Sequence, residues 1–144
     1  MYDYPRINCI FAPHIVNRQI KIGLTLRAIE DMRYYTALTI AGSDSCGGAG
    51  IQADIKTISA LGVYAASAIT AITVQNTKGV YGIQKVEPEI VKGQIEAVMD
   101  DIHPDAIKIG MVNDTDTIHA IAETLAKYKG KYQYLIIDPV MVST

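Results

Sequence analysis

From residue 37 onward, short apolar runs typical of β-strands alternate with segments in which apolar residues recur at helical spacing. In residues 49–62, Ile51, Ile55 and Ile58 are spaced i, i+4 and i+7, and Gly62 is a natural helix stop. The apolar runs lie at 37–42, 63–74, 106–111 and 134–140, with a weaker one at 82–87. Helices between buried parallel strands predict an α/β three-layer sandwich with a mainly parallel sheet.

Two further helices are predicted in the second half of the sequence. The first spans residues 88–101 and begins with Pro88, which suits the first turn of a helix. The second begins near Asn113 or Asp114, either of which can cap it, and its apolar stripe consists of Ile118, Ile121, Ala122 and Leu125. The run YLIIDPV at 134–140 does not alternate, which predicts a strand covered on both faces of the sheet.

Composition excludes several classes of function. The chain has 144 residues and a formal net charge of −2, which argues against a nucleic-acid partner because such proteins usually carry a basic surface. No apolar stretch approaches the length that spans a bilayer, so we expect no membrane association. The two cysteines, Cys9 and Cys46, form no disulfide or metal-binding pattern, and no secretory signal is present. We therefore expect a reduced, cytoplasmic protein that acts on a small molecule.

The first 36 residues differ in charge from the rest of the chain. They carry a net charge of +2, against −4 for the remainder, and they lack a clear apolar period. Met32 lies shortly before the first convincing strand, so translation from that residue would give a compact domain start. We interpret residues 1–32 as a leader outside the fold and residues 33–144 as the folded domain.

A glycine-rich loop, GSDSCGGAGIQAD, joins the first predicted strand to the first predicted helix. Its glycines lie at positions 42, 47, 48 and 50. Such turns let backbone amides approach a ligand closely, and a helix N-terminus favours anions. The spacing matches neither G-x-G-x-x-G nor G-x-x-x-x-G-K-[ST], so the dinucleotide and Walker interpretations fail. A tight structural turn without a ligand is the alternative.

Several residues in or near this loop have a structural and a chemical interpretation. Asp44 and Asp54 could act as acid, base or metal ligand, but an Asp in a glycine loop more often accepts local backbone hydrogen bonds. Asp54 is expected on the solvated face of its helix. Cys46 has no evident base beside it, which favours a small buried thiol over a nucleophile. The three histidines share no metal-ligand spacing, so surface or packing roles are expected for them: His14, His103 and His119.

Two residues lie at the carboxyl ends of predicted strands, where α/β proteins place reactive groups. Gln75 in VQNT offers an acceptor and two donors, which match the ring nitrogen and exocyclic amine of an aminopyrimidine. Satisfying loop backbone is the alternative role for this amide. Asp138 in IIDPV is followed by Pro139, which ends the strand ladder, and both a functional and a capping role are open.

Three blocks of sequence carry a family resemblance. In order they are ALTIAGSDSCGGAGIQADIKTISALGVYAASAITAITVQNT, KIGM and IIDPVM. They resemble the hydroxymethylpyrimidine/phosphomethylpyrimidine kinases of thiamine biosynthesis, within the ribokinase-like superfamily. The resemblance covers residues 33–144, and the first block is long enough to be specific.

The resemblance implies a ribokinase-like sandwich and a kinase that uses ATP and Mg²⁺. The family phosphorylates 4-amino-5-hydroxymethyl-2-methylpyrimidine and then its monophosphate. By this resemblance the glycine loop, including Gly42, Gly48 and Ala49, lines the pyrimidine pocket. Gln75 recognises the pyrimidine, and Met111 and Val140 pack on its ring. Asp138 lies near the phosphates and the metal.

Two further family elements do not occur in the sequence. The family's Gly-Thr-Gly-Cys turn, whose cysteine is the proposed base, is absent, as is the Lys-Ser-Gly-Asp segment that usually follows DPVM. Cys46 lies in the substrate loop and cannot take the role of that cysteine, so no catalytic residue is assigned. The chain therefore resembles the N-terminal half of a kinase. A non-catalytic pyrimidine-binding half-domain and a pyridoxal kinase-like activity are alternatives, and a homo-oligomer is compatible with the sequence.

The absent elements generate a first prediction. The 144-residue chain by itself should phosphorylate the hydroxymethylpyrimidine no faster than background, because most of the charge stabilisation that phosphoryl transfer needs would be missing. A coupled assay of ADP release with the purified chain, ATP and Mg²⁺ measures this rate. Turnover that depends on the added pyrimidine would contradict the expectation.

Overall fold

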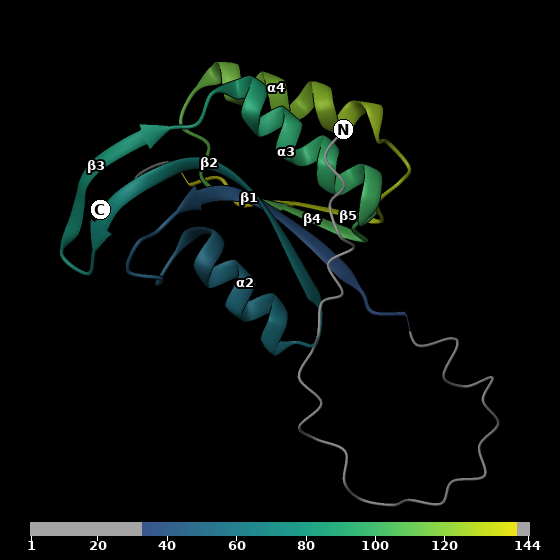
Figure 1. Ribbon diagram of the computed structural model, residues 1–144, viewed down its shortest axis with the longest axis horizontal. Helices are drawn as coiled ribbons and strands as arrows, with labels where there is room; N and C mark the ends of the chain where they lie inside the picture. The colour runs from purple at the N-terminus through teal and green to yellow at the C-terminus, as the bar shows by residue number, and fades with distance from the viewer. Residues whose placement is uncertain (1–32, 141–144) are drawn as a thin grey trace, which may run out of the picture. The chain divides into compact units, whose positions relative to one another are not determined.

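A computed structural model describes residues 33–140, and the predicted leader at 1–32 lies outside the described residues (Figure 1). None of the helices in this part of the chain has the length and hydrophobicity to cross a membrane. The described residues form five strands and three helices. In chain order they are β1 (Thr36–Ser43), α2 (Gly50–Ala60), β2 (Tyr64–Asn76), β3 (Gly79–Lys85), α3 (Pro88–Asp101), β4 (Ala106–Ile109), α4 (Thr115–Lys127) and β5 (Tyr134–Ile137).

The strands form a single mixed sheet in the order β3-β2-β1-β4-β5. β1 is parallel to both β2 and β4, and β4 is parallel to β5, whereas β3 returns along β2 as an antiparallel hairpin. In Figure 1, α3 and α4 cover one face of the sheet and α2 covers the other. The predicted α/β sandwich with a mainly parallel sheet is therefore confirmed for the described residues.

The main core lies between the sheet and the pair α3 and α4. Alternate residues of β1 and β4 point into it, and α3 contributes side chains at i, i+4 and i+8, the spacing of one helix face. These fully buried residues are Leu38 and Ile40 of β1, Ile107 of β4, and Val91, Ile95 and Met99 of α3.

The helix boundaries follow the predicted signals. Asp114 caps α4, since its carboxylate accepts a hydrogen bond from the backbone N–H of Thr117 at 2.8 Å. Gly62 follows α2 with a φ of 77° and donates its N–H to Ser59, as expected of a helix stop. The stripe predicted on α4 is only half correct, because Ile121 and Leu125 are buried whereas Ile118 and Ala122 are exposed.

Two predicted strands are less buried than their sequences indicate. The region 63–74 is buried only in part, because the end of β2 leaves β1 and continues as a two-stranded ribbon with β3, in which Ile72 and Val74 are exposed. The prediction that 134–140 is covered on both faces is wrong for the described structure. All four residues of β5 are exposed, because the described helices leave both faces of this edge strand largely uncovered. An apolar groove of about 640 Å³ runs between β5 and α4.

The α3 helix offers a matched test of the core. Ile95 is fully buried, whereas Ile90 on the same helix is 59% exposed. Ile95→Ala should lower the free energy of unfolding by about 2–5 kcal/mol, because it removes buried apolar surface and leaves a cavity. Ile90→Ala should change it by about 0.5 kcal/mol or less. Urea unfolding of both variants measures the difference, and equal effects would show that α3 does not pack as described.

Candidate functional site

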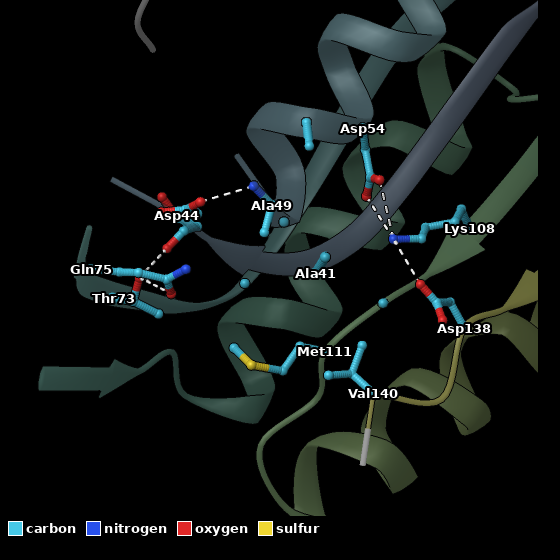
Figure 2. Close-up of a pocket in the computed structure, with 15 residues that line it drawn as sticks. Ala41, Asp44, Ala49, Asp54, Thr73, Gln75, Lys108, Met111, Asp138 and Val140 are labelled. Carbon is cyan, nitrogen blue, oxygen red and sulfur yellow. Dashed lines mark hydrogen bonds and ion pairs between the residues drawn. The ribbon is translucent and has the colours of Figure 1, made fainter. Parts of the chain in front are cut away.

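A cavity of about 280 Å³ lies at the edge of the sheet where β1, β4 and β5 end (Figure 2). Parallel strands align their carboxyl ends, and ligands of open α/β sheets bind at that edge. The walls come from β1 and its glycine loop, α2, the end of β2, β4, and the segments that follow β4 and β5. The lining includes Gly42, Asp44, Ala49, Asp54, Thr73, Gln75, Lys108, Met111, Asp138 and Val140.

The glycine loop is shaped by one close approach of the backbone to itself. Gly50, the first residue of α2, has a φ of 56°, and a Cβ built on it would lie 2.2 Å from the carbonyl oxygen of Gly42. Any side chain at position 50 would clash with backbone, and the left-handed φ also favours glycine. The loop therefore turns back on the end of β1 and closes one side of the cavity.

The Asp44 carboxylate holds this loop from the inside. It is buried and accepts hydrogen bonds from the backbone N–H groups of Cys46, Gly48 and Ala49 at 2.8–2.9 Å. Burial alone raises the pKa of Asp44, but these hydrogen bonds, with that from the Cys46 thiol, outweigh it and hold the pKa below its ordinary value. The prediction of local backbone hydrogen bonds is confirmed. Asp44 thus occupies the amides before α2 that could otherwise have bound an external anion.

Gln75 lies at the end of β2 and faces the cavity (Figure 2). The Ser45 hydroxyl donates to the Gln75 carbonyl at 2.6 Å and accepts from its backbone N–H at 3.0 Å, so the glycine loop fixes the backbone of this residue. The Thr73 hydroxyl lies 3.4 Å from the Gln75 side-chain oxygen, but its single hydrogen is donated to Ser43 at 2.9 Å. The side-chain amide of Gln75 is therefore only weakly held and can bind a ligand.

A charged cluster forms the opposite wall of the cavity. The Lys108 ammonium donates to both Asp54 carboxylate oxygens, at 2.9 and 3.1 Å, and lies 3.9 Å from an Asp138 oxygen. Asp54 also accepts a 2.6 Å hydrogen bond from the hydroxyl of the buried Thr39. The prediction that Asp54 is simply solvated is wrong, because α2 lies on the sheet and turns this residue towards β4. Asp138 is 61% exposed and follows β5 as predicted.

The structure brings together six of the seven substrate and phosphate residues that the resemblance implied. Gly42, Ala49, Gln75, Met111, Asp138 and Val140 all line the cavity. Gly48 does not line it, and its backbone N–H donates to Asp44. Glycine at position 42 leaves room for Met111, whose Cε would lie 2.6 Å from an added Cβ.

Two further expectations concern reactive side chains. The prediction that Cys46 is buried is wrong, since its thiol is free and exposed on the loop. His103 contacts the Met99 carbonyl through Nδ1 at 2.7 Å, which is a packing role. Among residues 33–140, no group of three His, Cys, Asp or Glu side chains is placed to hold a metal ion.

Sequence reasoning missed Ser45, Thr73 and Lys108. A signal for Lys108 was present, because it is the single charge in the apolar strand AIKI, and a lysine directed into a fold needs a partner. No comparable signal marked the other two, because a serine in a loop and a threonine in a strand are common and their partners lie 30 residues away in the sequence.

The hydrogen bonds to Asp44 generate a pH prediction. A carboxyl whose pKa is lowered by folding stabilises the fold above its unfolded pKa, near 3.8, and this contribution is lost as the pH falls through the folded pKa. Asp44→Asn should therefore be less stable than the unmodified chain at pH 7, and the gap should narrow below about pH 4. Thermal unfolding from pH 7 to 3 measures this gap, with the exposed Asp101→Asn as the control. A gap that does not change with pH would refute the charged role.

Comparison with known proteins identifies the family of this chain. The family model described as phosphomethylpyrimidine kinase matches residues 44–144. A hydroxymethylpyrimidine/phosphomethylpyrimidine kinase of Rhizobium meliloti is 59% identical over 108 residues, which are 75% of this chain and 40% of that protein. The crystal structure of a phosphomethylpyrimidine kinase from Clostridium difficile has a TM-score of 0.72 at 57% identity, over 76% of this chain and 47% of that one.

Pyridoxal kinases are more distant neighbours with the same ribokinase-like fold. The structure of the Staphylococcus aureus enzyme in complex with AMP-PCP and pyridoxal has a TM-score of 0.67 at 35% identity, over 77% of this chain and 41% of that one. The chain thus spans about two fifths of the length of the curated pyrimidine kinase and under half of these solved kinases. On the match over residues 44–144 and the identity within it, the chain belongs to the phosphomethylpyrimidine kinase family.

Proposed function

We propose that this chain supplies the pyrimidine-binding part of a thiamine-pathway kinase. The reaction transfers phosphate from ATP to 4-amino-5-hydroxymethyl-2-methylpyrimidine and then to its monophosphate. One observation carries the proposal: Gln75 presents a weakly held amide to a small cavity at the carboxyl edge of the sheet.

The chemistry of the cavity wall suits an aminopyrimidine. A side-chain amide offers a donor and an acceptor side by side, and these complement a ring nitrogen and the neighbouring exocyclic amine. Met111 and Val140 supply apolar contacts for the ring, while Gly42 and Ala49 bring backbone close to it. Gly48 acts indirectly in this proposal, by fixing the loop through Asp44.

Asp138 is the residue that would hold Mg²⁺. Its carboxylate is 61% exposed at the cavity and lies 3.9 Å from Lys108, too far for a hydrogen bond, so its oxygens can bind a cation. Mg²⁺ is usually held by one or two carboxylates together with waters and substrate phosphates, which fits a single acidic residue here. When bound, the ion would neutralise charge on the phosphates of ATP.

The described residues act in this proposal by binding and orienting the substrate. Phosphoryl transfer depends mainly on positioning and on electrostatic stabilisation of the transferred group. The cavity orients the pyrimidine through Gln75, and no described residue is assigned as the base for its hydroxyl. A pyrimidine-binding module without catalysis of its own is the nearest alternative.

A pyridoxal kinase-like activity is the second candidate, supported by the shared fold and 35% identity to the S. aureus enzyme. The identity of 59% to a pyrimidine kinase favours the pyrimidine. Comparing affinities of the chain for pyridoxal and for the hydroxymethylpyrimidine distinguishes the two, and tighter binding of pyridoxal would favour the second.

Location and assembly belong to the same proposal. A cytoplasmic location is part of this proposal, since Cys46 is the cysteine among the described residues, its side chain is exposed, and the cytoplasm keeps thiols reduced. The exposed apolar strand β5 supports association of the chain with itself.

The proposal predicts that pyrimidine binding depends on one amide. Gln75→Ala should weaken binding of the hydroxymethylpyrimidine about tenfold or more, because two hydrogen bonds are lost from a partly buried site. Gln84→Ala is the control, since Gln84 is exposed on β3 and does not line the cavity. Isothermal titration calorimetry of the three proteins measures the effect. Binding that survives Gln75→Ala unchanged would overturn the proposed role of the amide.

A further inference from the structure

The charges of the cavity are unbalanced. Three carboxylates line it, from Asp44, Asp54 and Asp138, and Lys108 is the one cation among the described lining residues. A free alcohol such as the hydroxymethylpyrimidine can enter such a site without an electrostatic cost. A phosphorylated pyrimidine brings up to two negative charges, and acidic walls repel it unless a cation receives the phosphate.

Lys108 has donor capacity left for such a group. An ammonium carries three N–H donors, and the two hydrogen bonds of Lys108 both go to the Asp54 carboxylate. The third N–H faces Asp138, whose carboxylate oxygen lies 3.9 Å from the Lys108 nitrogen. This distance makes an ion pair but is too long for a hydrogen bond. The side chain is 26% exposed and lines the cavity, so an anion there can reach the ammonium (Figure 2).

The surrounding residues keep the ammonium in this place. Asp54 on α2 accepts the hydrogen bonds of the ammonium, and Thr39 on the sheet holds Asp54 by donating to it. Glycine at position 110 leaves room for the Lys108 side chain, because a Cβ there would lie 2.8 Å from Lys108 Nζ and 3.1 Å from the Ala41 side chain. A purely structural link between α2 and β4 would not require the ammonium to line the cavity.

We propose that Lys108 is a specificity-determining residue that binds the phosphate of the pyrimidine monophosphate and so admits the second substrate of the reaction. The inference rests on the proposed function, because it assumes that the pyrimidine binds in this cavity. Asp54 and Thr39 are positioning residues that aim the ammonium. Lys108 has little effect on the unphosphorylated alcohol, which Gln75 and the apolar wall bind.

Binding measurements on the 144-residue chain test this inference without requiring turnover. Calorimetry is performed without Mg²⁺, using the hydroxymethylpyrimidine and its monophosphate as separate ligands. Lys108→Met should weaken binding of the monophosphate about tenfold or more, because a charge-assisted contact is lost, and should change binding of the alcohol about twofold or less. Lys127→Met is the matched control, since it also removes a lysine from an ion pair, with Glu96, away from the cavity. Lys108→Arg should retain the preference for the monophosphate that Lys108→Met loses.

The outcomes separate the inference from the function on which it rests. Equal weakening of both ligands by Lys108→Met would overturn the inference and leave the proposed function standing. Failure of the unmodified chain to bind either ligand would overturn both.

A second measurement needs no variant and covers the case in which Lys108→Met does not fold. Raising NaCl from 50 to about 500 mM should weaken binding of the monophosphate and hardly affect the alcohol, because salt screens the charge interaction; equal salt dependence would overturn the inference.

Discussion

The carbonyl oxygen of Gly42 lies so close to Gly50 that no side chain fits at position 50, and the site depends on this contact. It turns the chain back directly after β1, which allows α2 to start over the edge of the sheet. That turn places Asp44 where its carboxylate accepts hydrogen bonds from three N–H groups of the loop, and it places Ser45 beside the backbone of Gln75. Hydrogen bonds thus tie the loop between β1 and α2 to the end of β2, and they hold the residues that the loop carries in place.

Three aspartates at one cavity have three different roles because their surroundings differ. Asp44 is buried and its carboxylate accepts hydrogen bonds from backbone amides, whereas Asp54 forms an ion pair with Lys108 and accepts a hydrogen bond from Thr39. Asp138 stands at the exposed end of β5 with the weakest ties of the three. One residue type therefore supplies a structural anchor, a positioning group and a carboxylate that can meet a ligand, and the distinction comes from hydrogen bonding and burial.

Much of the fold was predictable from sequence, because helical and strand periodicity report local structure. The bounds of α3 and the cap of α4 were correct, and so was the parallel core of the sheet. Exposure was predicted less well, because it depends on which elements cover a strand, and the apolar run of β5 gives no sign of that. Gln75 and Asp138 stand out in the sequence because each lies at the carboxyl end of a predicted strand, and the family resemblance supplied the roles expected of them. The pairing of Asp54 with Lys108 joins residues 54 positions apart and follows only from the packing of α2 on the sheet.

The open side of β5 has a geometric consequence for the chemistry of the cavity. Strands in a sheet lie about 4.8 Å apart, and parallel strands keep their carboxyl ends in line. A polypeptide that paired in parallel with β5 would therefore bring its own strand end, and the loop after it, alongside Asp138 and Val140. The sheet works as a template here: backbone pairing at one edge determines which new side chains can reach the pocket, whichever molecule provides them.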